Sequence, residues 1–227
     1  HMGSTSDRDD YHDYYTTTVQ TGLTAAPWCA MSRHGDDIRL FWTQTSANDI
    51  KQVRTASGPG FEIADGTGDM GRGAAGARAS DGTFYVVHRD NSNTALHISR
   101  LLPGGLWQSA QLDNQANVGT DASVAIDSNG VLHISYFDSS ATALRYITGT
   151  WDNWSASVIV DNTGNVGKDS AIALDAAGVP HIAYYDDTNN DVRYATNRGG
   201  TWTTENVTPD SGNNNGQYAA IAVTDDG

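Results

Sequence analysis

Short runs of alternating apolar and polar residues follow one another along the chain, separated by turns rich in glycine, asparagine and aspartate. Residues 181–185 (HIAYY) alternate in this way, and so do residues 191–195 (DVRYA). A period of two residues is typical of half-buried β-strands. This alternation leaves no room for helices, and we predict an all-β chain of short strands.

The same pattern returns at a fixed interval. Residues 117–127 (NVGTDASVAID) align with residues 165–175 (NVGKDSAIALD), 48 positions later, and the match continues through the next strand. Two earlier copies are more divergent: residues 82–90 keep the offset of 48, and residues 39–42 fill the same place at about 46. Self-similarity at such a period indicates tandem structural repeats. The predicted units span approximately residues 24–65, 72–113, 120–161 and 168–209.

Each unit predicts four strands. The first carries small and aliphatic residues, as in residues 171–174, and the fourth opens with an aromatic residue such as Trp202. Four strands in 40 to 50 residues is the period of a propeller blade. Small residues suit the crowded strand nearest the axis, and aromatic residues fill the wedge between blades. We predict a β-propeller of four-stranded antiparallel blades, with about four full repeats plus a split partial blade.

The two ends of the chain predict that split blade. We assign residues 1–13 to a cloning tag and an N-terminal tail, and residues 14–227 to the propeller. Residues 14–19 match a fourth strand, and residues 217–227 match a first strand with its turn. The second and third strands of this blade are missing. Three explanations stay open: a truncated larger propeller, an incomplete five-bladed ring, or self-association in which another chain supplies the strands.

The units resemble the repeats of bacterial secreted and cell-surface β-propellers, which carry a Gly-x-x-His-Ile-x-Tyr-Tyr-Asp second strand, as in residues 178–186, and a Trp-led fourth strand. The turn at residues 196–202 is also similar to the Asp-box of sialidase-like propellers, although it lacks the Asp expected near Arg198. The resemblance covers about residues 14–227. It implies a secreted or cell-surface protein, but propellers host lectins, hydrolases, lyases and scaffolds alike.

The charge of the chain narrows its partners. The formal net charge is −14, from 27 acidic and 13 basic residues. Proteins that bind nucleic acid or anionic membrane surfaces do so through clustered Lys and Arg. Because this chain is strongly acidic, we expect neither as a partner. No stretch is long and apolar enough to insert in a membrane. Cys29 stands alone, which rules out an intrachain disulfide and a cysteine-based metal site.

Two histidines, His133 and His181, recur at one repeat position, five residues before Asp138 and Asp186. A His–Asp pair can serve acid–base chemistry or bind a metal. Recurrence favours a structural hydrogen-bond staple instead, because a catalytic site is needed once rather than in every blade.

Polar loops follow the second strand of each unit and also join successive units. In a propeller these two sets of loops emerge on one face. Carboxylates and amides beside aromatic rings suit sugars, which have hydroxyl edges and apolar faces. Oxygen-rich loops can also hold Ca²⁺, and ordinary tight turns use the same residues. The predicted ligand-binding residues are Asp90, Asn91, Tyr136, Asp138, Ser139, Tyr184, Asp186, Asp187 and Asn189.

Catalytic residues are not assigned. Both glutamates, Glu62 and Glu205, fall on predicted fourth strands at the outer rim, and no nucleophile elbow or phosphate-binding loop occurs. A pair of aspartates can still serve a glycosidase. The sequence favours a non-enzymatic recognition module for carbohydrate or another cell-surface ligand. The alternatives are a glycoside hydrolase or polysaccharide lyase, and a protein-binding scaffold.

Overall fold

A computed structural model of the chain describes residues 25–34, 37–44, 49–54, 61–65, 70–103, 105–115, 117–208 and 216–224, with side chains from Ala74 onward. All of the regular structure in these ranges is β-strand, as predicted. None of the described residues forms a helix that could span a membrane.

The strands form four sheets, and each sheet is an antiparallel meander in chain order. In the third sheet a short strand and a longer one share the fourth-strand place, since both pair with β11 (Ala143–Thr150). The first two sheets contain β1 (Ala25–His34), β2 (Asp37–Gln44), β3 (Asp49–Arg54) and β4 (Phe61–Asp65), then β5 (Met70–Arg78), β6 (Phe84–Asp90), β7 (Ala95–Leu101) and β8 (Trp107–Asp113). The last two contain β9 (Val118–Ile126), β10 (Leu132–Asp138), β11 (Ala143–Thr150), β12 (Asn153–Trp154) and β13 (Val158–Asp161), then β14 (Val166–Leu174), β15 (Pro180–Asp186), β16 (Asp191–Thr196) and β17 (Thr203–Asn206).

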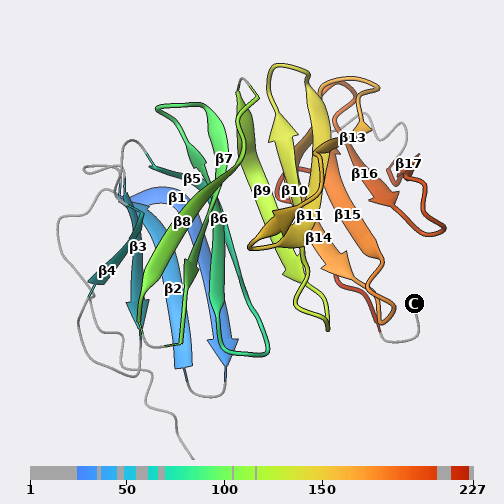
Figure 1. Cartoon of the computed structure of the whole chain (residues 1–227). Helices are drawn as coiled ribbons and strands as arrows, with labels where there is room; N and C mark the ends of the chain where they lie inside the picture. The colour runs from blue at the N-terminus through green and yellow to red at the C-terminus, as the bar shows by residue number, and fades with distance from the viewer. Residues whose placement is uncertain are drawn as a thin grey trace, which may run out of the picture.

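The sheets stand side by side as propeller blades (Figure 1). Their first strands contact one another in chain order, β1 with β5, β5 with β9, and β9 with β14, so these strands surround a shared axis. The hydrophobic core lies between blades: one buried cluster joins the second and third blades, and another joins the third and fourth. The predicted fold class, an all-β propeller of four-stranded antiparallel blades, is confirmed.

Adjacent blades approach closely at a glycine near the start of β9 and of β14. A Cβ on Gly167 would lie 2.6 Å from the Cα of Leu144 in the preceding blade, and a Cβ on Gly119 would lie 2.9 Å from the Cα of Leu96. Both glycines have positive φ, +106° and +90°. Glycine is required here because it fits the contact and adopts this backbone conformation without a steric penalty.

The segment of residues 216–224 continues this arrangement without forming a strand. Gly216 has φ +107° and packs against the backbone of Asp191 and Val192, as the earlier glycines pack against their preceding blades. A turn follows, and residues 216–224 pair with no strand of the described chain. The first strand predicted for residues 217–223 is therefore not formed, because a β-strand needs a hydrogen-bonded neighbour. The matching strand predicted at residues 14–19 lies outside the described residues.

Candidate ligand-binding site

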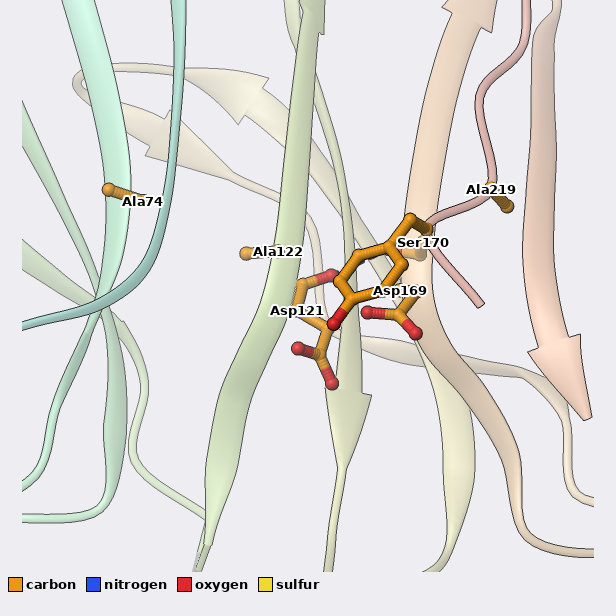
Figure 2. Close-up of a pocket in the computed structure, with 7 residues that line it drawn as sticks. Ala74, Asp121, Ala122, Asp169, Ser170 and Ala219 are labelled. Atoms are coloured by element: carbon orange, nitrogen blue, oxygen red, sulfur yellow. Dashed lines mark hydrogen bonds between the residues drawn. The ribbon is translucent and has the colours of Figure 1, made fainter. Parts of the chain in front are cut away.

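A pocket of about 230 Å³ opens where the first strands meet at the axis (Figure 2). The second, third and fourth blades contribute to its wall, together with the segment after the fourth blade. The lining residues are Ala74, Asp121, Ala122, Asp169, Ser170, Tyr218 and Ala219.

Small residues keep this pocket open. Ala74, Ala122, Ser170 and Ala219 follow one another at intervals of 48, 48 and 49 positions, so they fill the same place in successive repeats. The sequence pattern predicted small side chains on the strands nearest the axis. Their lack of bulk leaves space that larger residues would fill.

A β-bulge in each first strand places the neighbouring residue at the axis. In β9, Asp121 and Ala122 together oppose the single residue Tyr136, since the register jumps between Ser135 and Phe137. The bulge recurs in β14 at Asp169, and in β5 at the place of Ala74. Bulges re-aim side chains and are frequent beside functional sites.

The first residue of the bulge has a left-handed backbone, with φ of 52° at Asp121 and 50° at Asp169. Tyr218 occupies the same repeat position outside any strand, and its φ is 60°. Aspartate tolerates this conformation better than most residues, and the second unit carries Gly73 at the same repeat position. Tyrosine is an outlier there. The Tyr218 side chain is 80% exposed. One repeat position thus presents two carboxylates and one aromatic ring to the same pocket.

The pocket changes the acidity of Asp121. Burial, together with the nearby charge of Asp169, raises the pKa of Asp121 to about 6, although a hydrogen bond from the Asp169 backbone and the charge of Lys168 act in the opposite direction. The Lys168 ammonium is itself held by Asp187, with 2.6 Å between Nζ and Oδ2. Among the side chains that the structure describes, no lysine, arginine or histidine lines the pocket.

Hydrogen bonds fix the polar wall. The Ser170 hydroxyl donates to the backbone carbonyl of Asp121 at 2.8 Å. The hydroxyls of Ser135 and Ser170 lie 2.9 Å apart, and since Ser170 already donates to Asp121, Ser135 is the donor of this pair. The serine hydrogen is therefore directed into the protein, whereas the carboxylate oxygens face the pocket as acceptors.

The loops predicted to share one face do meet. The backbone N–H of Ser139 donates to the carbonyl of Asn117 at 3.0 Å, and that of Asp187 donates to the carbonyl of Asn165 at 2.9 Å. In the third and fourth blades these bonds join the loop after the second strand to the loop before the same blade, at the end of the first strands that holds the pocket. Four of the predicted contact residues are half-buried or exposed at these loops: Asn91, Ser139, Asp187 and Asn189.

The other five predicted contact residues lie in the core instead: Asp90, Tyr136, Asp138, Tyr184 and Asp186 are each at most 2% exposed. Asp138 accepts the backbone N–H groups of Ser140 and Ala141, at 3.0 and 2.9 Å. The Tyr136 hydroxyl donates to Asp113 of the preceding blade at 2.6 Å. Burial and these bonds give the five side chains a structural role here, so we do not place them in the candidate site.

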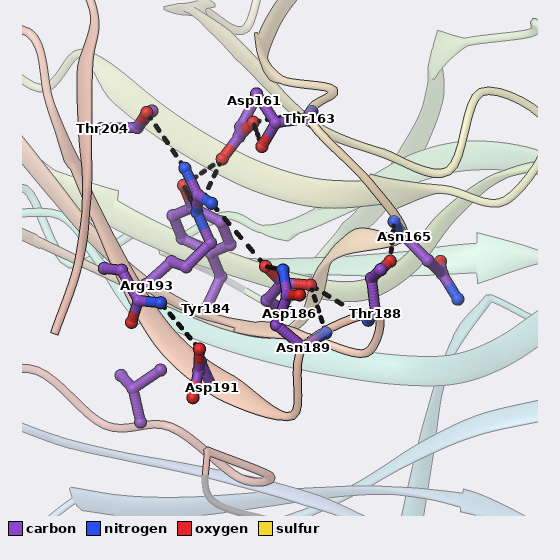
Figure 3. A network of polar contacts seen from close by, with 12 residues as sticks. Asp161, Thr163, Asn165, Tyr184, Asp186, Thr188, Asn189, Asp191, Arg193 and Thr204 are labelled. Carbon is purple, nitrogen blue, oxygen red and sulfur yellow. Dashed lines mark hydrogen bonds and ion pairs between the residues drawn. The ribbon is translucent and has the colours of Figure 1, made fainter. Parts of the chain in front are cut away.

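The same network recurs between the third and fourth blades (Figure 3). The Tyr184 hydroxyl donates to Asp161 at 2.6 Å, and the Arg193 guanidinium lies 3.0 Å from Asp161 and 3.6 Å from Asp186. Burial alone would raise the pKa of Asp161, but hydrogen bonds from Tyr184 and Thr163 and the charge of Arg193 outweigh it, so the pKa lies below its ordinary value. These networks tie the third blade to the second and the fourth blade to the third.

The recurring histidines also bond within the blade. His133 Nδ1 lies 2.6 Å from the Tyr146 hydroxyl, and His181 Nδ1 makes the same contact with Tyr194. His181 Nε2 lies 3.5 Å from Asp175. The structure thus shows hydrogen-bond staples between second and third strands, with tyrosine as the partner rather than the aspartate five positions later.

In the described part of the chain, no three His, Cys, Asp or Glu side chains lie close enough together to hold a metal ion. Calcium binding by the polar loops stays a prediction.

Known proteins resemble this chain in fold. No protein-family profile and no curated protein sequence matches the chain. Among solved structures, a variant of AofleA from Arthrobotrys oligospora is 13% identical with a TM-score of 0.58, over 79% of this chain and 56% of that one. The six-bladed Aleuria aurantia lectin, described by its fucose recognition, is 14% identical with a TM-score of 0.52, over 81% and 61%. A thermostable family-43 glycoside hydrolase is 15% identical with a TM-score of 0.54, over 88% and 80%.

The chain therefore spans between half and two thirds of the length of AofleA and of the Aleuria lectin, and a larger share of the hydrolase. Identities this low show the fold alone: the chain is similar in architecture to propellers that bind or cleave carbohydrate, and it is itself a β-propeller.

Proposed function

We propose that this protein binds carbohydrate in the axial pocket. The observation that carries the proposal is the meeting of two carboxylates, Asp121 and Asp169, with the exposed ring of Tyr218 in one pocket. Sugar hydroxyls donate charge-assisted hydrogen bonds to carboxylates, and the apolar face of a sugar ring packs on an aromatic side chain. The pocket offers both kinds of contact at once.

The size of the pocket favours one sugar ring. Its volume of about 230 Å³ lies below the range of roughly 300–1,000 Å³ that is usual for drug-sized ligands. A single ring suits this space better than an extended chain. Further contacts at the loop face, through Asn91, Ser139, Asp187 and Asn189, stay a prediction. The fold similarity to a fucose-recognising lectin and to a glycoside hydrolase supports a carbohydrate ligand.

Isothermal titration with methyl glycosides of fucose, galactose, glucose and N-acetylglucosamine tests the proposal. We expect at least one to bind, and Tyr218→Ala to weaken that binding roughly 3- to 10-fold through lost stacking. Leu106→Ala is the matched control, because Leu106 is also exposed, at 60%, but follows β7 at the opposite face. Absence of heat and of competition with every sugar would refute the proposal.

Glycoside hydrolysis is a second candidate, favoured by the raised pKa of Asp121 beside Asp169. A carboxyl group whose pKa is raised can act as a general acid beside a second carboxyl group. Release of nitrophenol from nitrophenyl glycosides, abolished by Asp121→Asn and retained by Asp152→Asn, would support hydrolysis. Binding of a glycoside without its hydrolysis would refute this second candidate and leave carbohydrate binding as the proposed function.

We also propose that the protein acts outside the cell, in keeping with the resemblance of its repeats to secreted and cell-surface propellers. Immunodetection in the culture medium or on intact source cells is the expected result. Recovery only from the cell interior would contradict it.

A further inference from the structure

The geometry of the axial pocket points to selection by charge: we infer that it prefers a sugar ring bearing an amine, accepts a neutral ring less tightly, and rejects a ring bearing a carboxylate. This inference rests on the proposed carbohydrate binding and names the class of sugar.

The first argument is the charge of the wall. Asp121 comes from β9 and Asp169 from β14, while β5 contributes Ala74 and has Gly73 at the equivalent bulge position. Lys168, the nearest cation in sequence, is bound to Asp187. A ligand ammonium would therefore meet two carboxylates, and no lysine, arginine or histidine stands beside them among the described side chains that line the pocket. A ligand carboxylate would be repelled by both.

The second argument is the supply of hydrogen-bond donors. The Ser170 hydroxyl donates to the Asp121 carbonyl, and the backbone N–H of Asp169 bonds to the Asp121 carboxylate. The acidic side of the pocket thus offers acceptors, and its nearest donors are already used. An ammonium group brings three donors and no acceptor, whereas a carboxylate brings acceptors only.

The third argument is independent of the acidic pair. Tyr218 presents an aromatic ring that is 80% exposed beside the pocket. Cations are attracted to the face of an aromatic ring, and the attraction grows when the site is partly shielded from water. An aromatic ring and carboxylates on one pocket form a surface that recognises ammonium groups, and the same ring still accepts the apolar face of a neutral sugar.

The test is isothermal titration at pH 7 with methyl glycosides of glucosamine, glucose and glucuronic acid, and with the matching galactose series. We expect the amine to bind at least about tenfold more tightly than the neutral ring of its series, and the acid at least about tenfold more weakly. Raising the salt concentration should narrow these ratios, because screening weakens charge interactions.

Two variants assign the effect to the pocket. Asp169→Asn removes one charge and keeps a residue that tolerates the left-handed backbone, so the ratio of amine to neutral affinity should fall to within about threefold. Asp152→Asn removes the same charge from an exposed turn after β11, at the opposite face, and should leave the ratio unchanged. Lowering the pH to 5 should also reduce the ratio in the wild type, because Asp121 then takes up a proton.

The outcomes separate the two proposals. Binding of neutral rings without any preference for amines, or equal binding of the acids, would overturn the inference and leave the proposed function standing. No binding of any ring would overturn both. A preference for amines that persists in Asp169→Asn but disappears in Asp152→Asn would place the selection elsewhere and overturn the assignment to this pocket.

Discussion

Replacing Gly167 with alanine should weaken the joint between the third and fourth blades far more than the same change at Gly130. The new Cβ at position 167 would lie 2.6 Å from the Cα of Leu144 and 2.8 Å from its Cβ, closer than carbon atoms can pack. At Gly130 nothing lies within 4 Å of the new Cβ. Both glycines have positive φ, +106° and +80°, so both variants carry backbone strain.

The expected magnitudes follow from these two contributions. Backbone strain costs about 1–2 kcal/mol for an L-residue in a left-handed conformation, and both variants should lose about this much. Overpacking against a fixed backbone adds typically about 1–3 kcal/mol, and only Gly167→Ala should lose it. The predicted free energy of unfolding therefore falls by about 2–5 kcal/mol at position 167 and by about 1–2 kcal/mol at position 130.

Urea denaturation followed by tryptophan fluorescence measures both losses, and thermal unfolding should show about 2–4 °C per kcal/mol for a chain of this size. Gly119→Ala is a second example of the same contact, with its new Cβ 2.9 Å from Leu96, and should resemble Gly167→Ala. Equal losses of unfolding free energy at positions 130 and 167 would refute the reasoning, since the close approach of the blades would then add nothing to the cost of the new Cβ.

Three further predictions concern buried polar groups. Tyr184→Phe removes the donor to Asp161 and should lower the free energy of unfolding by about 1–3 kcal/mol in urea titrations. Arg145→Met leaves Asp138 buried without its guanidinium partner at 2.6 Å, and should cost about 3–5 kcal/mol in the same assay. For Asp121, whose pKa is raised to about 6 in the folded protein, the native state binds more protons than the unfolded state between about pH 4 and 6, so stability falls as the pH rises through this window. The free energy of unfolding of Asp121→Asn should therefore exceed that of the wild type by up to about 3 kcal/mol at pH 7 and equal it near pH 3.5. A stability difference between variant and wild type that is the same at both pH values would contradict the raised pKa.

The strand pattern and its repeat specified the blades because both are local signals. Alternation in residues 181–185 defines a strand, Gly and Asp define the turns around it, and the offset of 48 copies the same unit. The four-stranded sheets and the small residues at the axis follow from this information. Residues 217–223 carry the same local signal but form no strand, because pairing depends on a neighbour that the local sequence does not encode.

The polar residues show where local signals end. Asp138 and Asp186 look like loop carboxylates in sequence, yet they are buried, because an arginine of the next strand and the backbone of the turn enclose them. Their neighbours Ser139 and Asp187 stay at the surface. Alternation cannot distinguish these cases, since Asp138 and Asp186 end their strands and Ser139 and Asp187 follow directly.

Asp121, Asp169 and Tyr218 were not predicted as site residues. The signal that could have found them lies two residues after the glycine that recurs near the start of each unit. This repeat position changes from glycine to aspartate to tyrosine along the chain. By itself the sequence determined strands, turns and small residues near an axis. Only the tertiary structure decided that bulges in β9 and β14 bring Asp121 and Asp169 to one pocket, and that the segment after the fourth blade adds Tyr218. Segments distant in sequence converge there, and burial then raises the pKa of Asp121.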